Sequence, residues 1–312
     1  MLKTADFERR TPMYELIQVG EHTYYIDCPA KMGVYQTSPT EAILIDSGND
    51  KDAAKKVLKI FDQQGWKLTM VINTHSHADH IGGNAMFQQR TGCMVYGPAM
   101  ESGTIKAPIY EPSLLYGGYP FKELRNKFLM AQPTEKFLTL DDQGMAHGKK
   151  VLPEGMEIIS LPGHAMNMIG VKTPDDVWFM ADCVSSPAVL SKYHVNFTYD
   201  VAEYLKTLEK IESMTAKLFV PSHTQPVESM EELVKLNREK VFEIKALLLE
   251  ICGEFIAFDD ILAKVFDHFG LVMDFSQNVL VGSTIRSYLS WLKDGGLMTA
   301  DIQNNRLVWK TV

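Results

Sequence analysis

Cysteine is scarce in this sequence: 312 residues contain four, and they are scattered along the chain, at Cys28, Cys93, Cys183 and Cys252. A chain of this length can bury enough apolar surface to fold without disulfide bonds. We therefore interpret these residues as reduced thiols, which are typical of a cytoplasmic protein.

Long apolar runs and an excess of positive charge are lacking as well. No run approaches the roughly 18 apolar residues that cross a bilayer, and the charged first ten residues contain no apolar signal segment. We therefore expect neither membrane insertion nor export. With 31 basic and 39 acidic residues, the net charge of −8 disfavours broad binding to nucleic acid, although it leaves a local basic groove possible.

Strand and helix patterns alternate along the first 228 residues. Alternating or continuous apolar runs predict strands, and apolar positions three or four apart predict helices. Helices are expected over 50–64 and at about 201–213, the second beginning with a capping box at Asp200 and Glu203. Strands are expected over 13–19, 22–27, 41–46, 70–74, 157–161, 168–172, 177–180 and 217–220. This order predicts an α/β protein with two β-sheets faced by helices.

Residues 101–150 interrupt the pattern with four prolines, the pair Gly117-Gly118 and many large apolar side chains. Two interpretations remain open for this range. It is either a surface insertion anchored on the body of the protein, or a lid over a binding site.

The last part of the chain, 229–312, has a different character. A capping box at Ser229 and Glu232 begins a helix, two more helices are expected over 259–269 and 276–293, and a hairpin over 297–310 turns at Asn304-Asn305. This order predicts a small winged-helix-like domain appended to a catalytic domain that spans 1–228. The segment carries nine basic and twelve acidic residues, so we expect packing against the core or homodimer formation rather than nucleic-acid binding.

Metal-ligand residues are concentrated at the ends of predicted strands. The strand over 70–74 leads into four candidate ligands, His75, His77, Asp79 and His80. His164, Asp182 and His223 each follow a later strand, which is where α/β proteins place their sites. Asp182 ends an apolar run, where a carboxylate is costly without a cation or hydrogen-bond donors. Seven donors exceed the needs of one ion and therefore predict a two-metal site.

The order His75-x-His77-x-Asp79-His80, then Gly163-His164, Asp182 and His223, resembles the metallo-β-lactamase superfamily, in its glyoxalase II-like hydrolase branch. The resemblance covers roughly residues 13–226. It implies an αβ/βα four-layer sandwich of two mixed β-sheets. It also implies that His75, His77 and His164 hold one metal ion and that Asp79, His80 and His223 hold the other. Asp182 would bridge the two ions, and Asp46 would orient a ligand.

The same resemblance implies a hydrolase in which a hydroxide bridging two divalent ions attacks a thioester, a lactone or a related ester. Zinc is favoured, although His and Asp donors also accept iron or manganese. Asp79 would help to orient the nucleophile, and Asp46 would support catalysis by orienting a metal ligand. The alternative is a metal-dependent phosphodiesterase or ribonuclease that holds nucleic acid with its C-terminal domain; a redox di-iron protein is a distant third. Family members often have Thr-Pro-Gly after the third histidine, whereas this chain has Ala165-Met166-Asn167, so the substrate stays open.

Overall fold

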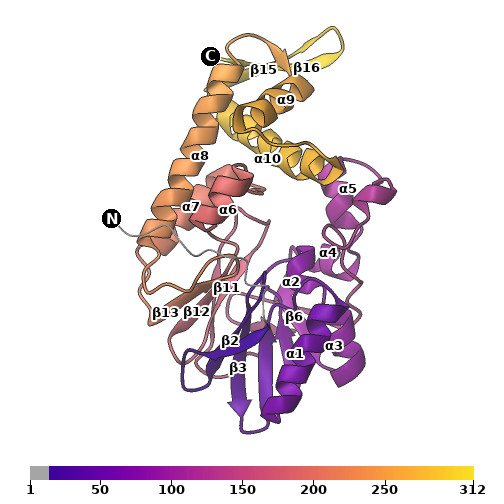
Figure 1. Cartoon of the computed structure of the whole chain (residues 1–312), viewed down its shortest axis with the longest axis vertical. Helices are drawn as coiled ribbons and strands as arrows, with labels where there is room; N and C mark the ends of the chain where they lie inside the picture. Colours follow the sequence, from indigo (N-terminus) through magenta and orange to yellow (C-terminus); the bar gives the residue numbers. More distant parts are fainter. Residues whose placement is uncertain (1–13) are drawn as a thin grey trace.

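The computed structural model describes residues 14–312, which form two β-sheets packed face to face, with helices on their outer faces (Figure 1). The charged N-terminal stretch and the first residue of the strand expected over 13–19 lie outside this range. The larger sheet has seven strands in chain order: β1 (Glu15–Gln18), β2 (Thr23–Asp27), β3 (Met32–Ser38), β4 (Glu41–Ile45), β5 (Lys67–Ile72), β6 (Met94–Pro98) and β7 (Phe137–Leu140). Strands β1 to β4 pair antiparallel, and β4 to β7 pair parallel.

The second sheet has four strands, again in chain order: β10 (Glu157–Ser160), β11 (Ile169–Lys172), β12 (Val177–Ala181) and β13 (Leu218–Pro221). Strands β10, β11 and β12 pair antiparallel, whereas β12 and β13 pair parallel. Both sheets are therefore mixed, as the sequence predicts.

Alternation of side chains along the strands creates the layers. In β4, Ala42 and Leu44 join the core beneath helices α1 (Lys51–Gln64) and α3 (Asn84–Thr91), whereas Ile43 and Ile45 join the core between the sheets. The second sheet is covered by helices α7 (Val201–Glu212) and α8 (Glu231–Ile251), and α6 (Pro187–Tyr193) packs against α8. The order helices, sheet, sheet, helices confirms the predicted four-layer sandwich.

Helices α1 and α7 begin at aspartate caps. The Asp50 side chain accepts hydrogen bonds from the backbone N–H groups of Asp52 and Ala53, and Asp200 accepts one from Glu203. Helix α1 ends at Gly65, which has a φ of 71°. Both helices lie within one residue of their predicted ranges.

The range expected to be an insertion is only partly one. It contains α4 (Ser102–Lys106), α5 (Tyr110–Tyr116), the 3₁₀ helix η1 (Lys122–Leu124) and the short strands β8 (Met145–Ala146) and β9 (Lys149–Lys150). It also supplies β7, which is the edge strand of the larger sheet beside β6. The helical part packs through Leu115, Leu124 and Leu129 against Val279 in the C-terminal segment.

The C-terminal segment contains the three predicted helices and the hairpin. After α8 come β14 (Ile256–Ala257), α9 (Phe258–Phe269), α10 (Phe275–Asp294), β15 (Met298–Gln303) and β16 (Arg306–Thr311), with the strands in the order β14-β16-β15. Asn304 and Asn305 both have positive φ, which suits the tight turn of the hairpin. One continuous core contains Phe219 of β13, Ile261 of α9 and Ile285 of α10. The hydrophobic core is therefore unbroken across residue 228.

Among residues 14–312, no helix combines the length and apolar character that a membrane span requires.

Candidate metal centre

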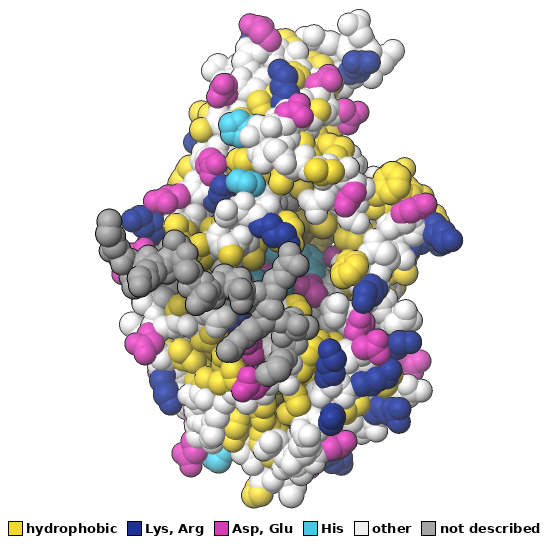
Figure 2. Space-filling view, viewed as in Figure 1, with side chains coloured by type: hydrophobic (Ala, Val, Ile, Leu, Met, Phe, Trp, Pro, Cys, Tyr) yellow, Lys and Arg dark blue, Asp and Glu magenta, His cyan; other side chains and the backbone are white. Residues whose placement is uncertain are grey.

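Five strand ends supply the predicted site residues at one edge of the two sheets. Asp46 follows β4, His164 follows β10, Asp182 follows β12 and His223 follows β13. The 75–80 loop follows β5, and its last residues form the first turn of the short helix α2 (Ala78–Ile81). The parallel pairs β4–β5 and β12–β13 bring carboxyl ends to the same edge. Figure 2 shows a hollow in the middle of the corresponding face, with histidine side chains at its floor.

The backbone around this edge is strained and tightly packed. Asp46 and Ala181, which precedes Asp182, have φ values of 61° and 49°, which non-glycine residues rarely adopt. A Cβ atom on Gly83 would lie 2.2 Å from the backbone oxygen of Ser47. Only glycine therefore allows the chain after the 75–80 loop to pass this close to the end of β4.

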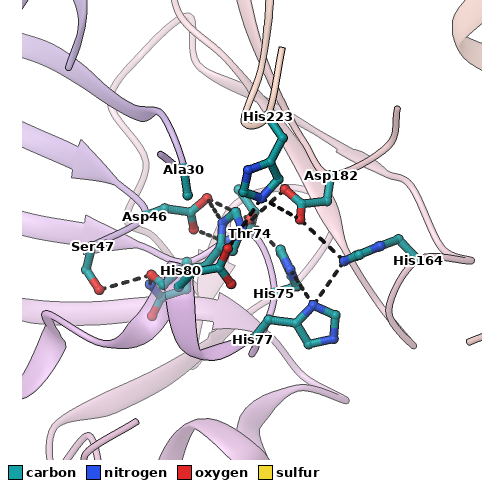
Figure 3. Close-up of polar contacts among 12 residues, drawn as sticks. Ala30, Asp46, Ser47, Thr74, His75, His77, His80, His164, Asp182 and His223 are labelled. Carbon is teal, nitrogen blue, oxygen red and sulfur yellow. Dashed lines mark hydrogen bonds and ion pairs between the residues drawn. The ribbon is translucent and has the colours of Figure 1, made fainter. Parts of the chain in front are cut away.

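Three imidazoles form the first cluster (Figure 3). His77 Nδ1 lies 3.0 Å from His75 Nε2 and 2.9 Å from His164 Nε2. His164 Nδ1 is 3.1 Å from the carbonyl oxygen of Phe197, to which it must donate, so its Nε2 carries a lone pair. His75 Nδ1 donates to Thr74 Oγ1 at 3.0 Å, because that hydroxyl gives its own proton to Asp46 Oδ2 at 2.8 Å. Two lone pairs therefore face His77 Nδ1, which has at most one proton to share between them.

The second cluster combines two histidines with two carboxylates. Asp182 places Oδ1 3.2 Å from His80 Nε2 and Oδ2 3.1 Å from His223 Nε2. Asp79 Oδ2 lies 3.3 Å from the same His223 nitrogen. His80 Nδ1 donates to Asp46 Oδ2 at 2.8 Å, and His223 Nδ1 donates to the carbonyl of Pro29 at 2.9 Å. Both Nε2 atoms therefore turn toward the carboxylates.

A divalent cation fits both clusters. The ligand atoms of each cluster lie within 4.8 Å of one another. Although His80 Nε2 and Asp182 Oδ1 face each other, both are buried and neither makes a well-aligned hydrogen bond within residues 14–312, which is costly unless a cation binds them. Asp182 Oδ2 is also 3.5 Å from His164 Nε2, so this carboxylate reaches the first cluster as well. Imidazole and carboxylate are donors that zinc, iron and manganese accept.

The two clusters differ in protonation. Burial lowers the pKa of His77 and of His164 to about 4, so the first cluster is neutral at pH 7. Burial also lowers the pKa of His223, but Asp182 and Asp79 outweigh it and raise the value to about 10. His80 behaves in the same way, because Asp182, Asp46 and Asp79 raise its pKa against the effect of burial.

Proton release follows from this difference. We expect the binding of two zinc ions at pH 7 to release protons from His80 and His223 and none from the first cluster, because metal ligands must be deprotonated. Because of the proton released from His223, zinc affinity at the second cluster should rise about tenfold per pH unit up to about pH 10, and the proton released from His80 should steepen this rise. Calorimetry in two buffers of different ionisation enthalpy measures this release, and binding without any release would contradict the assignment.

Asp46 supports both clusters, since its carboxylate accepts from the Thr74 backbone N–H, the Thr74 hydroxyl and His80. We expect Asp46→Asn to weaken metal binding about 10- to 100-fold, the range for partners of ligating histidines. Asparagine tolerates positive φ, so the backbone should persist. Asp176→Asn is the matched control, because Asp176 has the same φ of 61° on the surface. Equal zinc affinities of the two variants in a chelator competition would contradict a role of Asp46 in metal binding.

Two supporting residues escape the sequence analysis. Thr74 immediately precedes the histidine motif, and this position in the sequence is a signal from which its contact with His75 could have been predicted. Glu101 offers none: it is 4% exposed and accepts hydrogen bonds from Ser76 Oγ at 2.5 Å and from the Asn167 backbone at 2.9 Å. It thereby ties the loop of His75 and His77 to the loop that follows His164.

Comparison with known proteins agrees with this geometry. Residues 26–223 match the family model described as the Metallo-beta-lactamase superfamily, and the chain belongs to that superfamily. A hydroxyacylglutathione hydrolase of Methylococcus capsulatus (strain Bath) is 48% identical over 50 residues, which cover 16% of this chain and 20% of the relative. One of Nitrobacter hamburgensis is 40% identical over 68 residues, which cover 22% and 25%. The chain thus spans a quarter or less of these relatives.

Solved structures share the fold over nearly the whole chain. A beta-lactamase domain protein from Burkholderia ambifaria has a TM-score of 0.72 and 16% identity, and the match covers 98% of this chain and 96% of that one. A metallo-beta-lactamase family protein from Thermus thermophilus has a TM-score of 0.70 and 16% identity, with 93% and 99% covered. These structures show that the chain has this fold, and the superfamily to which it belongs implies divalent metal ions.

Proposed function

We propose that the protein hydrolyses a thioester, a lactone or a related ester at a dinuclear metal centre. In this proposal His75, His77 and His164 hold one ion, Asp79, His80 and His223 hold the other, and Asp182 binds both. The observation that carries the proposal is the pair of adjoining clusters whose ligand atoms converge and which share the Asp182 carboxylate. Zinc is the favoured metal, and iron or manganese would suit the same donors.

Two bound divalent ions would lower the pKa of a water molecule toward neutrality and would polarise the acyl carbonyl. The chain's own residues orient this chemistry. The Asp79 side chain is 40% exposed, whereas that of Asp182 is 9% exposed. Asp79 can therefore accept a hydrogen bond from a water molecule while it faces His223. Asp46 holds His80 in the tautomer whose Nε2 faces the cluster.

The relatives support an acyl substrate. The matched curated proteins are named hydroxyacylglutathione hydrolases, and such a substrate joins an acyl group to a thiol. A small cavity of about 130 Å³ beside His164, Asp182 and His223 has Val184 and Phe197 among its walls. A small molecule is thus the proposed substrate, and the phosphodiesterase alternative rests on the C-terminal segment alone.

A substrate panel tests the proposal. Metal-free and zinc-reconstituted protein would be assayed on acyl thioesters, lactones, oxygen esters, an aryl phosphodiester and structured RNA. We expect hydrolysis of at least one acyl substrate only after reconstitution. Turnover of the phosphodiester or RNA without any acyl substrate would favour the alternative, and turnover by metal-free protein would overturn both.

A further inference from the structure

The C-terminal helices lie outside the family match, which ends at residue 223, yet they bond to the loops that carry two of the proposed metal ligands. We infer that α8 and α10 are part of the metal centre and that Asn237 and Thr284 are positioning residues for Asp182 and His164. This inference rests on the proposed metal role of those two ligands.

The segment 197–200 holds His164 from two sides. The carbonyl of Phe197 accepts the Nδ1 proton of the imidazole at 3.1 Å. The backbone N–H groups of Tyr199 and Asp200 donate to the carbonyl of Gly163 at 2.9 and 3.0 Å. The Phe197 ring also lies edge-on to the imidazole, with centroids 5.7 Å apart. The direction of the His164 lone pair therefore depends on where this segment lies.

Helix α10 fixes that segment. The backbone N–H of Thr198 donates to Thr284 Oγ1 at 3.2 Å, and Ser287 Oγ donates to the carbonyl of Tyr199 at 2.7 Å. Thr284 is fully buried, and Thr198 is 4% exposed. The Thr198 N–H therefore has no access to water in place of this bond, and losing the Thr284 hydroxyl would leave it unpaired.

Helix α8 holds the loop of Asp182 through one amide. Asn237, which is 2% exposed, accepts from the backbone N–H of Ser185 at 2.9 Å and donates to the Ser185 carbonyl at 2.9 Å. The same amide accepts from the Tyr204 hydroxyl at 3.1 Å and donates to the Leu233 carbonyl at 2.8 Å. The Asn237 side chain thus donates both of its N–H protons and accepts two hydrogen bonds at its oxygen, so the orientation of the amide is fixed. Ser185 follows Asp182 by three residues.

Helix α10 also joins the helical part of 101–150 to the same region. Val279 packs with Leu124 and Leu129, and the Phe197 side chain packs against this cluster. Figure 1 shows α5 and α10 meeting above the sheets. The C-terminal helices, the inserted helices and the His164 loop thus form one packed unit, which differs from a separable module appended for another purpose.

The full-length variant Thr284→Val tests the inference, since valine keeps the volume and removes the hydroxyl. We expect zinc affinity at the His164 cluster to fall about tenfold, the low end of the range for partners that contact a ligand directly. The visible spectrum of the cobalt-substituted protein should change, and kcat should fall more than KM rises. Ser283→Ala is the matched control, because in the described part of the chain its hydroxyl bonds only to the Leu280 carbonyl of its own helix. Thr284→Ser, which keeps the hydroxyl, should restore affinity.

The outcomes separate this inference from the proposed function. If wild-type protein fails to bind two ions, the proposed metal centre is wrong. If wild-type protein binds two ions and Thr284→Val binds them equally tightly with an unchanged cobalt spectrum, only the inference is overturned. Should Thr284→Val fail to fold, Ser287→Ala at a half-buried position replaces it. The zinc affinity of Ser287→Ala should also fall below that of wild-type protein. An unchanged affinity and an unchanged cobalt spectrum of this variant would equally overturn the inference.

Discussion

Replacing Asp182 by asparagine is expected to lower kcat/KM by a factor on the order of 10³ or more. The carboxylate contacts His80 and His223 of one cluster and lies 3.5 Å from His164 of the other, so it is the side chain that both proposed ions share. Asparagine has nearly the same size but lacks the charge and one oxygen ligand. A metal ion supplies several kcal/mol of transition-state stabilisation, and each 1.36 kcal/mol is worth about tenfold in rate.

Metal content and kcat/KM of the Asp182→Asn protein would be measured together. Cys183→Ala is the matched control, because Cys183 is the next residue and burial raises the pKa of its thiol, which keeps it protonated. We expect the control to keep both ions and most of its activity. An Asp182→Asn protein that retained more than about a tenth of wild-type activity would contradict the shared role of this carboxylate.

Removal of the metal ions is expected to abolish hydrolysis and to destabilise the fold. Each ion that binds only the folded chain stabilises it by about 4 kcal/mol when its free concentration is a thousand times Kd. Chelator-treated and reconstituted samples would be compared by thermal unfolding and by activity. A demonstrably metal-free sample with full activity and an unchanged Tm would refute metal dependence.

The metal-free protein should also lose stability as the pH falls from 6.5 to 5. In the folded chain the pKa of His77 and of His164 is about 4, below the ordinary 6.5, so the unfolded chain binds more protons in this interval. The free energy of unfolding therefore falls with falling pH, and at pH 5 it is lower than at neutral pH by roughly 2 kcal/mol for each of these two histidines. His223 acts in the opposite direction above pH 6.5, because its raised pKa stabilises the fold less as the pH rises toward 10. Reconstituted protein should lose stability more steeply between pH 6.5 and 5, because its metal-bound histidines carry no proton whereas the unfolded chain protonates them, and it should lose the dependence above pH 6.5.

The histidine and aspartate positions could be predicted because they are tied to local sequence signals. His75, His77, Asp79 and His80 lie close together in the sequence directly after β5, and His164, Asp182 and His223 each follow a recognisable apolar strand. Their spatial convergence then follows from where strands end. The acceptors that orient these imidazoles could not be predicted, because the carbonyls of Pro29 and Phe197 are backbone groups that any residue would supply.

The unpredicted parts of the fold have equally physical causes. Strand β7 has four residues, too few for an alternating pattern, and it forms because the edge of β6 needs a partner for its backbone groups. The sequence predicts packing of the C-terminal segment against the core as one of two possibilities, but it does not predict that the C-terminal helices share the core of the second sheet. Helical periodicity shows that α10 has an apolar face, but it does not show which surface that face will cover. The separate domain expected from residue 229 onward stays a prediction.

The position of the ions in a crystal shows whether the two clusters bind metal together. Crystals of the zinc-reconstituted protein would be measured at wavelengths on either side of the zinc absorption edge, and anomalous difference maps would be calculated. The account predicts two peaks, one among His75, His77 and His164 and one among Asp79, His80 and His223, with Asp182 beside both. A catalytically active crystal preparation with no peak at this edge of the sheets, or with zinc only elsewhere, would contradict it.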